Sequence, residues 1–315
     1  MRDTMRPDAE LPRAVCVTGA GGFIGLHTVR RFLDQGWFVY AVVRRSVPDE
    51  LKKWEQEGRV RLLRLDITDF PGLRKTLTLL PRLDAVVHCA AKASDVGQDA
   101  TFRKTNFEAV KEIAGLVLAR DHGVLVHVST TDVYGLRDFA GETEAELKLD
   151  RTAKNPYPKY KIKAEDWLQK HMPAARYSIV RPAAVWGRDD PTITQRMRDF
   201  LRVSPWIVHF GPWKGRNRWP LAHVERVAGA CYLAATCPEA RGLAFHVLDP
   251  AFVTLDAVYR RIAREYFPEK RFRTLCLPFW MGAIIGAASS AVAFLADMDH
   301  PPWDPSLYAL RSVSR

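Results

Sequence analysis

The sequence has few cysteines, no internal repeat and no leader-like N-terminus. Its five cysteines are scattered over 315 residues, and no two stand at CxxC spacing. This pattern argues against a disulfide framework and favours a reduced, cytoplasmic compartment. The nine histidines form no cluster with metal-ligand spacing, so we expect no metal. Residues 1–13 are polar and lack an apolar stretch, which argues against a secretory signal.

Acidic residues are too few to balance the basic ones, and the net charge is +11. A solvated basic surface explains such a charge most simply. Alternatively, the positive charge serves to attract a polyanionic cofactor, an anionic membrane surface or nucleic acid. The basic stretches 151–163 and 214–218 match no nucleic-acid-binding module, so we expect no nucleic acid partner.

Short β-branched runs alternate with helical patterns through most of the chain. The expected strands are 14–18, 38–43, 60–65, 85–89, 123–129, 176–180 and a late one at 243–248. This alternation predicts an α/β fold with a doubly wound parallel Rossmann sheet. We expect this domain to cover 12–186, with 223–250 returning to it. The segments 187–222 and 251–315 would form a smaller C-terminal substrate-binding or lid region, with a long loop over 205–220.

One segment, 275–296, contains no charged residue. Its length would just span a bilayer, and Arg271, Arg273 and Trp280 resemble interfacial anchors. Pro278, two glycines and two serines make it less apolar than typical spans. A buried or membrane-surface helix is therefore the favoured interpretation, and a transmembrane span is the alternative.

A glycine-rich turn, Val17–Gly25, follows the first expected strand and opens a helix. Gly19, Gly22 and Gly25 have GxxGxxG spacing, which allows a tight turn, close approach of a pyrophosphate, and close packing of helix on sheet. The pyrophosphate would lie at the helix N-terminus, where Phe23 and Ile24 begin the first turn. The segment predicts a dinucleotide-binding site.

The second expected strand ends in Arg44 and Arg45, without the acid that usually binds the adenosine ribose in NAD-specific sites. A carboxylate would repel a 2′-phosphate, whereas arginine binds one bidentately. We therefore favour NADP(H) over NAD(H), with solvated arginines as the simpler alternative. Asp66 and Ile67 follow the third strand and are expected at the adenine, although Asp66 could equally serve a turn.

Tyr157 and Lys161 lie four residues apart after the helix-start signal Asn155-Pro156, so they share a helix face. A free tyrosine has a pKa near 10, and a nearby ammonium favours the phenolate. Tyr157 would then exchange a proton with a carbonyl or alcohol oxygen, while Lys161 holds the nicotinamide ribose. Thr130, just after the fifth strand, is the expected hydroxyl on the substrate oxygen, with Ser129 next in preference.

Together these motifs resemble the extended short-chain dehydrogenase/reductase family, within the NAD-dependent epimerase/dehydratase superfamily. The resemblance covers nearly the whole chain and includes 87–92, Asn106, 181–187 and 222–228. It implies that Thr130, Tyr157 and Lys161 form the triad and that Asn106 supports the lysine through water. It also implies that the segment after the fourth strand lines the cofactor, namely Ala90, Ala91 and Lys92.

Within this family, 88–99 and 186–192 are most similar to the 3β-hydroxysteroid dehydrogenase branch, as is 277–280 before an apolar helix. That resemblance implies a lipophilic substrate such as a sterol, isoprenoid or long-chain ketone, for which a tryptophan-rich lid is suited. Tyr160 replaces the usual serine before the lysine, and a bulky phenol is expected near the nicotinamide. Glu225-Arg226 replaces a usual Asp-Asp pair. The sequence stops soon after 301–311, where many relatives continue, so closing contacts from a tail are expected to be missing.

The leading hypothesis is an NAD(P)-dependent oxidoreductase that interconverts a secondary alcohol and a ketone on a lipophilic small molecule. A nucleotide-sugar 4-epimerase is the first alternative, because epimerisation needs no extra acid. A sugar dehydratase would place Asp and Glu where Thr131 and Asp132 stand. A non-catalytic NADP(H)-sensing protein is the second alternative, although such proteins usually lose the tyrosine or lysine. By analogy, a homodimer would form through helices 102–120 and 158–171. We expect a cytoplasmic location, with membrane association through 275–296.

Overall fold

The centre of the molecule is a seven-stranded parallel sheet. The computed structural model describes residues 12–139, 141–296, 298 and 306–313. The strands run in the order β11-β6-β5-β4-β1-β2-β3, and all neighbours are parallel. They are β1 (Ala14–Thr18), β2 (Phe38–Val43), β3 (Val60–Arg64), β4 (Ala85–His88), β5 (Val124–Val128), β6 (Tyr177–Pro182) and β11 (Ala244–Val247). The doubly wound Rossmann prediction is confirmed, and the strand order reverses at β1 and β4.

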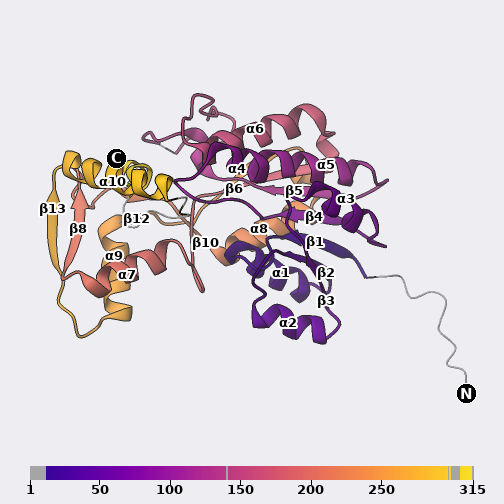
Figure 1. The fold of residues 1–315 in the computed structure, drawn as a ribbon, viewed down its shortest axis with the longest axis horizontal. Helices are drawn as coiled ribbons and strands as arrows, with labels where there is room; N and C mark the ends of the chain where they lie inside the picture. The colour runs from indigo at the N-terminus through magenta and orange to yellow at the C-terminus, as the bar shows by residue number, and fades with distance from the viewer. Residues whose placement is uncertain (1–11, 140, 297, 299–305, 314–315) are drawn as a thin grey trace, which may run out of the picture.

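Helices cover both faces of this sheet, as Figure 1 shows. On one face pack α1 (Phe23–Asp34) and α8 (Val224–Thr236), with α2 (Asp49–Gln56) beside the outer strands. On the other face pack α3 (Phe70–Thr78), α5 (Ala109–Leu118) and α6 (Pro156–His171). In β1, Val15 and Val17 point to the first layer, whereas Ala14 and Cys16 point to the second. This two-sided burial explains why Ala14, Val15, Cys16 and Val17 of β1 form a continuous apolar run rather than alternating with polar residues.

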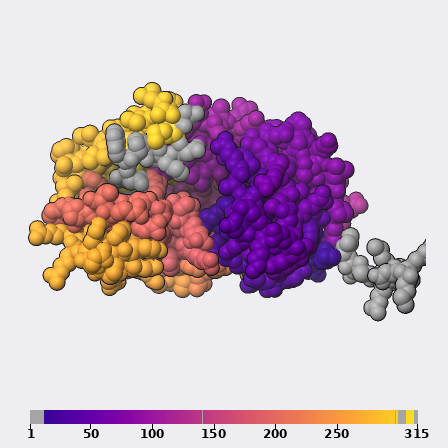
Figure 2. Space-filling view, turned by 60° about the horizontal axis from the view of Figure 1, so that its bottom comes forward, coloured from indigo at the N-terminus to yellow at the C-terminus, as the bar shows by residue number. Residues whose placement is uncertain are grey.

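A smaller lobe continues from the carboxyl side of the sheet, and Figure 2 shows the two lobes side by side. It contains three two-stranded pairs, β7–β10, β9–β12 and β8–β13. Its elements are β7 (Ala184–Trp186), α7 (Ile193–Val203), β8 (Trp206–Phe210), β9 (Arg218–Trp219), β10 (Leu221–His223), β12 (Val253–Thr254), α9 (Leu255–Tyr266), β13 (Arg273–Leu277), α10 (Phe279–Leu295) and α11 (Leu307–Val313). The expected loop over 205–220 is therefore wrong in part, because β8 finds its partner far along the chain in β13.

Helix α10 buries its small residues and exposes its large apolar ones. Its buried stripe consists of Gly282, Gly286, Ser289 and Ala293. The exposed fractions of its large side chains are 62% for Trp280, 63% for Ile284, 58% for Phe294 and 83% for Leu295. The glycines are needed for close packing, because a Cβ at Gly286 would lie 2.9 Å from the backbone nitrogen of Leu307 in α11. Within the described ranges, no helix is long and apolar enough to cross a membrane.

Candidate active site

The glycine turn forms a cradle in which Gly19 and Gly25 have no room for a side chain. Gly19 has a φ of +67°, and its carbonyl accepts a hydrogen bond from the Gly22 amide at 2.9 Å. A Cβ on Gly25 would lie 2.0 Å from the carbonyl oxygen of Gly19. Helix α1 begins directly after Gly22, with no side-chain cap and no acidic residue in its first turn. The open amide groups and the positive end of the helix fit the pyrophosphate of a dinucleotide.

Basic and acidic side chains meet at the ends of β2 and β3. Arg44 and Arg45 are exposed there, and the Arg44 guanidinium lies 3.8 Å from the Asp66 carboxylate. Burial alone would raise the pKa of Asp66, but hydrogen bonds from Thr68 and the nearby Arg44 hold it below its usual range. Asp66 is thus both a turn residue and a neighbour of Arg44, and Ile67 is buried beside it.

The segment after β4 is tied to the glycine turn. A Cβ on Gly19 would lie 2.8 Å from the Cα of Ala90, so the two backbones are in contact. The Ala90 amide donates to the Thr18 hydroxyl at 3.2 Å. This contact places Ala90 at the cofactor cradle, with Ala91 and Lys92 following it along the chain.

Asn106 lies buried in a π-helical turn, Lys104–Glu108, between α4 (Asp99–Arg103) and α5. The sequence predicted one continuous helix here. The Asn106 side chain accepts a hydrogen bond from the Lys92 amide at 2.8 Å and donates to the Lys92 carbonyl at 3.0 Å. Asn106 therefore shapes the loop after β4, and its support of Lys161 through water stays a prediction.

The structure brings Thr130, Tyr157 and Lys161 together at the carboxyl end of β5. Asn155 caps α6 by accepting a hydrogen bond from the Tyr157 amide at 2.9 Å, which sets the start of the helix. The Tyr157 phenol lies near enough to Thr130 for that side chain to lower the pKa of the phenol. One turn further, the buried Lys161 ammonium donates to the Val128 carbonyl at 2.7 Å. Burial lowers the pKa of Lys161 to about 8, against the opposing effects of Cys89 and Glu165.

The expected direction of the Tyr157 pKa shift is wrong for the protein by itself. Burial and the nearby Asp132 carboxylate raise the pKa of Tyr157, and only the nearby Thr130 side chain opposes them. The spacing of Tyr157 and Lys161 indicates the lysine charge but carries no sign that the phenol is buried. Tyr157 is therefore a neutral phenol in this structure, suited to donate a proton.

Ser129 is engaged elsewhere, which supports Thr130 as the substrate-binding hydroxyl. The Ser129 hydroxyl donates to Glu165 at 2.5 Å, and the Arg181 Nε donates to the same buried carboxylate at 3.1 Å. Arg181 also donates to the Tyr134 hydroxyl at 2.5 Å. This buried network joins β5, α6 and β6 behind the triad. Sequence reasoning missed Glu165, although its position four residues after Lys161 was a signal.

Two buried histidines, His88 and His127, lie beside Lys161 and were also missed. They are neighbours in register on β4 and β5, and their rings stack with centroids 5.8 Å apart. Burial lowers the pKa of His88 to about 3 and that of His127 well below its usual range, so both rings are neutral. Their equal positions at two strand ends were the signal in the sequence.

Two predicted departures have structural explanations. Tyr160 is buried and its hydroxyl donates to Asp99 at the start of α4, so the phenol is anchored on that helix. The Glu225 carboxylate lies 2.6 Å from Nδ1 of the buried His27 in α1. This contact connects α8 to the helix of the glycine turn.

Helix α11 lies against the loop after β4 and the short turn after β5. The Ser306 hydroxyl donates to Asp95, and Tyr308 lies near enough to the Asp132 carboxyl to lower the pKa of that group. These contacts come from α11 itself, and the expected lack of contacts from a longer tail stays a prediction. Burial and the Asp95 charge raise the pKa of Asp132 to about 6, although the nearby Tyr308 opposes this.

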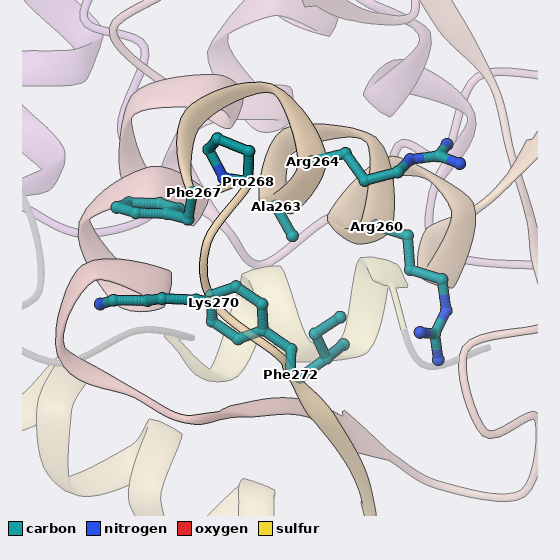
Figure 3. A pocket seen from close by; sticks show the side chains of 8 residues that line it. Arg260, Ala263, Arg264, Phe267, Pro268, Lys270 and Phe272 are labelled. Carbon is teal, nitrogen blue, oxygen red and sulfur yellow. The ribbon is translucent and has the colours of Figure 1, made fainter.

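A pocket of about 310 Å³ lies in the smaller lobe and contains none of the predicted site residues (Figure 3). Two of its charged side chains are engaged in contacts: Arg260 pairs with Asp256 at 2.6 Å, and Lys270 donates to the Arg202 carbonyl at 2.8 Å. Its lining residues are Ile207, Arg260, Ala263, Arg264, Phe267, Pro268, Lys270 and Phe272. We therefore do not place the reaction there.

Comparison with known proteins agrees with this geometry. The chain is 30% identical over 197 residues to a dTDP-4-dehydro-6-deoxy-D-allose reductase from a Streptomyces species, covering 59% of this chain and 60% of that protein. It is 27% identical over 228 residues to a 4-hydroxy-2-methyl-3-oxo-4-farnesyl-3,4-dihydroquinoline-1-oxide ketoreductase from Stigmatella aurantiaca, covering 70% of this chain and 59% of that protein. The matches thus span about 60% of the length of these curated relatives.

Solved structures show the same fold. The UDP-glucose 4-epimerase of Thermotoga maritima superposes with a TM-score of 0.68 at 22% identity, covering 83% of this chain and 85% of that one. The terminal R domain of the myxalamid PKS-NRPS pathway gives a TM-score of 0.70 at 22% identity, covering 98% and 81%. The sequence profile of the NAD dependent epimerase/dehydratase family matches residues 15–246. The cradle, the sheet and this match together show that the chain belongs to the NAD dependent epimerase/dehydratase family.

Proposed function

We propose that the protein is an NAD(P)-dependent oxidoreductase that interconverts a secondary alcohol and a ketone. The observation that carries this proposal is the nearness of the Tyr157 phenol to Thr130, one helical turn from the buried Lys161 that donates to the Val128 carbonyl. All three groups stand at the same sheet edge as the glycine cradle, because parallel strands end there together. The arrangement offers two hydroxyl groups to one substrate oxygen. A sensing protein would not need this arrangement.

The site residues would have separate roles in binding the cofactor and in proton transfer. The cradle of Gly19, Gly22 and Gly25 would hold the pyrophosphate, and Ala90 would border the nicotinamide half. When bound, the cofactor supplies or accepts the hydride. Thr130 and Tyr157 bond the substrate oxygen, and Tyr157 gives its proton to that oxygen as the carbonyl is reduced. Lys161, as a buried ammonium, stabilises the phenolate that this transfer leaves.

Substitution of Tyr157 by Phe tests the mechanism. The variant keeps the ring and its packing but lacks the transferable proton, so kcat/KM should fall by at least about 10²-fold, at the low end of the range for general acid catalysis. The dissociation constant for NADPH, measured by cofactor fluorescence, should change less than about twofold, because Tyr157 is not part of the glycine cradle. Unchanged turnover in this variant would refute the assignment of Tyr157.

The cofactor preference is proposed to be NADP(H) rather than NAD(H). Arg44 and Arg45 are the charged side chains that follow β2, and the nearby Asp66 belongs to the next strand end. The Arg44 contact with Asp66 is long, at 3.8 Å, so the guanidinium can turn to a 2′-phosphate without losing a close ion pair.

The substrate is proposed to be a lipophilic ketone or alcohol, in line with the resemblance to the 3β-hydroxysteroid dehydrogenase branch. Two observations support it: the exposed apolar side chains of α10, and the likeness to a ketoreductase whose named substrate carries a farnesyl group. A nucleotide sugar is the second candidate, because the chain also resembles a reductase named for a dTDP-sugar. Turnover of a long-chain ketone but not of a nucleotide keto-sugar would favour the first, and the converse would favour the second.

We further propose that α10 contacts an anionic membrane surface on the cytoplasmic side. Its large apolar side chains point outward, which is unusual for a surface helix in water. The segment 275–296 has no acidic residue to repel anionic lipid, and the exposed Arg271 and Arg273 precede it. The described cysteines are all free, as a reducing compartment requires. Dimerisation through 102–120 and 158–171 stays a prediction.

Vesicle flotation tests the membrane proposal. The protein should float with vesicles of phosphatidylcholine and phosphatidylglycerol, and less with phosphatidylcholine alone. The double variant Ile284→Ser, Phe294→Ser should remain in the bottom fraction, without the vesicles. The control Leu79→Ser, Val203→Ser changes side chains that are 73% and 82% exposed elsewhere and should still float. If the wild type instead forms a concentration-dependent dimer, and the Ile284→Ser, Phe294→Ser variant is a monomer, the exposed face of α10 binds a second copy of the chain.

A further inference from the structure

The side chain of Asn155 is hydrogen bonded at both ends of its amide group. Its oxygen accepts from the Tyr157 amide at 2.9 Å, and its nitrogen donates to the Asp95 carbonyl at 3.0 Å. An amide side chain offers its oxygen as an acceptor and its NH₂ as a donor, so these two bonds also determine how the group is turned. The start of α6 is therefore tied to Asp95, which lies 60 residues before Asn155 in the loop after β4.

The first turn of α6 has few backbone bonds of its own. Pro156 and Pro158 have no amide hydrogen, so Tyr157 carries the single backbone donor of these three residues. The Asn155 side chain binds that donor, and the Asn155 carbonyl accepts from the Lys159 amide at 3.2 Å. The backbone that carries the Tyr157 phenol is therefore positioned through Asn155.

Asp95 lies in a small turn that its two neighbours close. The Ser94 hydroxyl donates to the Val96 carbonyl at 2.8 Å and accepts from the Val96 amide at 3.2 Å. Ser94 and Val96 are both buried. The carboxylate and the carbonyl of Asp95 belong to this one compact turn, so we expect a displacement of the carboxylate to move the carbonyl as well.

Two elements of the smaller lobe contact the Asp95 carboxylate. The fully buried Ser306 hydroxyl donates to Oδ2 of Asp95, and it accepts from the Ala309 amide at 3.0 Å. The Arg196 guanidinium of α7 lies 3.9 Å from the same carboxylate oxygen. Contacts from α7 and from the start of α11 therefore converge on one oxygen atom in a loop of the larger lobe.

We propose that Asp95 is a positioning residue that connects the smaller lobe to the proton donor Tyr157. Its carboxylate is held by Ser306 and Arg196, and its carbonyl holds Asn155. Asn155 in turn binds the Tyr157 amide, so Asp95 acts through Asn155. The inference rests on the proposed function, because the group that Asp95 positions is the proposed acid. It predicts that the rate of proton transfer depends on contacts between the lobes, whereas cofactor binding does not.

The variant Asn155→Asp breaks this connection at one bond. Aspartate caps a helix as well as asparagine does, so the Tyr157 amide keeps its partner. The Asp95 carbonyl, however, loses its donor. With NADPH and the probe that the wild type reduces, the long-chain ketone or the nucleotide keto-sugar, kcat should fall by about 10- to 100-fold because the phenol is misplaced. KM for that probe and the dissociation constant for NADPH should change less than about threefold, because the glycine cradle is unaltered.

Asp95 itself allows a loss and a rescue at one position. Asp95→Ala removes the contacts with the smaller lobe and should lower kcat as Asn155→Asp does. Asp95→Asn keeps an oxygen for the Ser306 hydroxyl and loses only the long ion pair with Arg196, so it should restore most of the rate. The double variant Asn155→Asp, Asp95→Ala should be little slower than either single variant, because both changes break the same series of contacts. Losses that multiply would overturn the inference.

Ser290→Ala is the matched control, because it removes a hydroxyl that joins α11 to α10 without touching Asp95. That hydroxyl donates to the Gly286 carbonyl at 2.7 Å and accepts from the Leu307 amide at 3.3 Å. Its kcat should stay within about twofold of the wild type. A loss as large as that in Asp95→Ala would show that any loosening of α11 slows the reaction, and would contradict a specific role of Asp95.

Hydrogen exchange separates this inference from the proposed function, since it needs no substrate. Without ligands, the amides of residues 157–162 should exchange faster in Asn155→Asp and Asp95→Ala than in the wild type, and at the wild-type rate in Asp95→Asn. This pattern without turnover of either probe would support the role of Asp95 and refute the redox function. Unchanged exchange in the first two variants, or unchanged kcat in an active enzyme, would refute the positioning role.

Discussion

Replacing Gly25 by Ala should damage the cofactor cradle while leaving the rest of the fold in place. The added Cβ would lie 2.0 Å from the Gly19 carbonyl oxygen and 2.7 Å from its carbon. Both atoms are backbone, so no side chain can rotate away, and α1 must shift away from the turn. That shift separates the helix N-terminus from the place where the pyrophosphate would lie.

The size of the effect follows from the cost of overpacking, which is typically about 1–3 kcal/mol. The variant can relieve this clash by opening the turn, and NADPH binding must then close the turn again. The affinity for NADPH should therefore fall by about 5- to 150-fold. Fluorescence titration with NADPH measures this directly, and thermal unfolding of the protein without cofactor measures the damage to the fold. The cofactor-bound protein should also gain less stability from a given NADPH concentration than the wild type does.

Gly229→Ala is the matched control, because a Cβ there meets nothing within 4 Å and the residue lies inside α8. It should stabilise the protein by up to about 1 kcal/mol through helix propensity and leave NADPH binding unchanged. An affinity for NADPH in Gly25→Ala within twofold of the wild type would refute the cradle, even if the melting temperature fell.

Three further predictions concern charges. The double variant Arg44→Ala, Arg45→Ala should weaken NADPH binding by about 10- to 100-fold and NADH binding less than threefold. Arg61→Ala is the control. Equal losses of affinity for both cofactors would contradict the assignment of these arginines to the 2′-phosphate. The Asp132 carboxyl has a pKa raised to about 6, so the stability it contributes as a neutral group is present below about pH 4 and is lost as the pH rises to about 6. Relative to Asp132→Asn, the wild type should thus lose about 1–2 kcal/mol of unfolding free energy between pH 4 and pH 7, measured with urea; a constant difference would contradict this. Glu165→Gln breaks the buried pair with Arg181 and should lower the free energy of unfolding by about 3–5 kcal/mol. The control Asp166→Asn breaks an exposed pair with Arg151 and should lower it by less than about 1 kcal/mol. Similar losses in the two variants would show that the buried network is not essential.

The sequence alone predicted those elements whose signal is local. The strands around 14–18 and 38–43 are uniformly apolar, and the glycine turn and the Asn155 cap are defined by neighbouring residues. The pairing of β8 with β13 was missed, because two strands more than sixty residues apart carry no local sign of each other. The raised pKa of Tyr157 was missed for a similar reason, since it depends on burial and on Asp132. The nearness of Tyr308 to Asp132 links positions more than 170 residues apart and needed the tertiary structure.

The order of elements along the chain also determines when the larger lobe can be completed during synthesis. Helix α8 covers one face of the sheet, where Val227, Cys231 and Ala234 pack in the core, and β11 pairs with β6 at the edge. Both are made only after residues 187–223 of the smaller lobe have left the ribosome. A nascent chain that ends at residue 186 exposes an apolar sheet face, so the two lobes must mature together rather than one after the other.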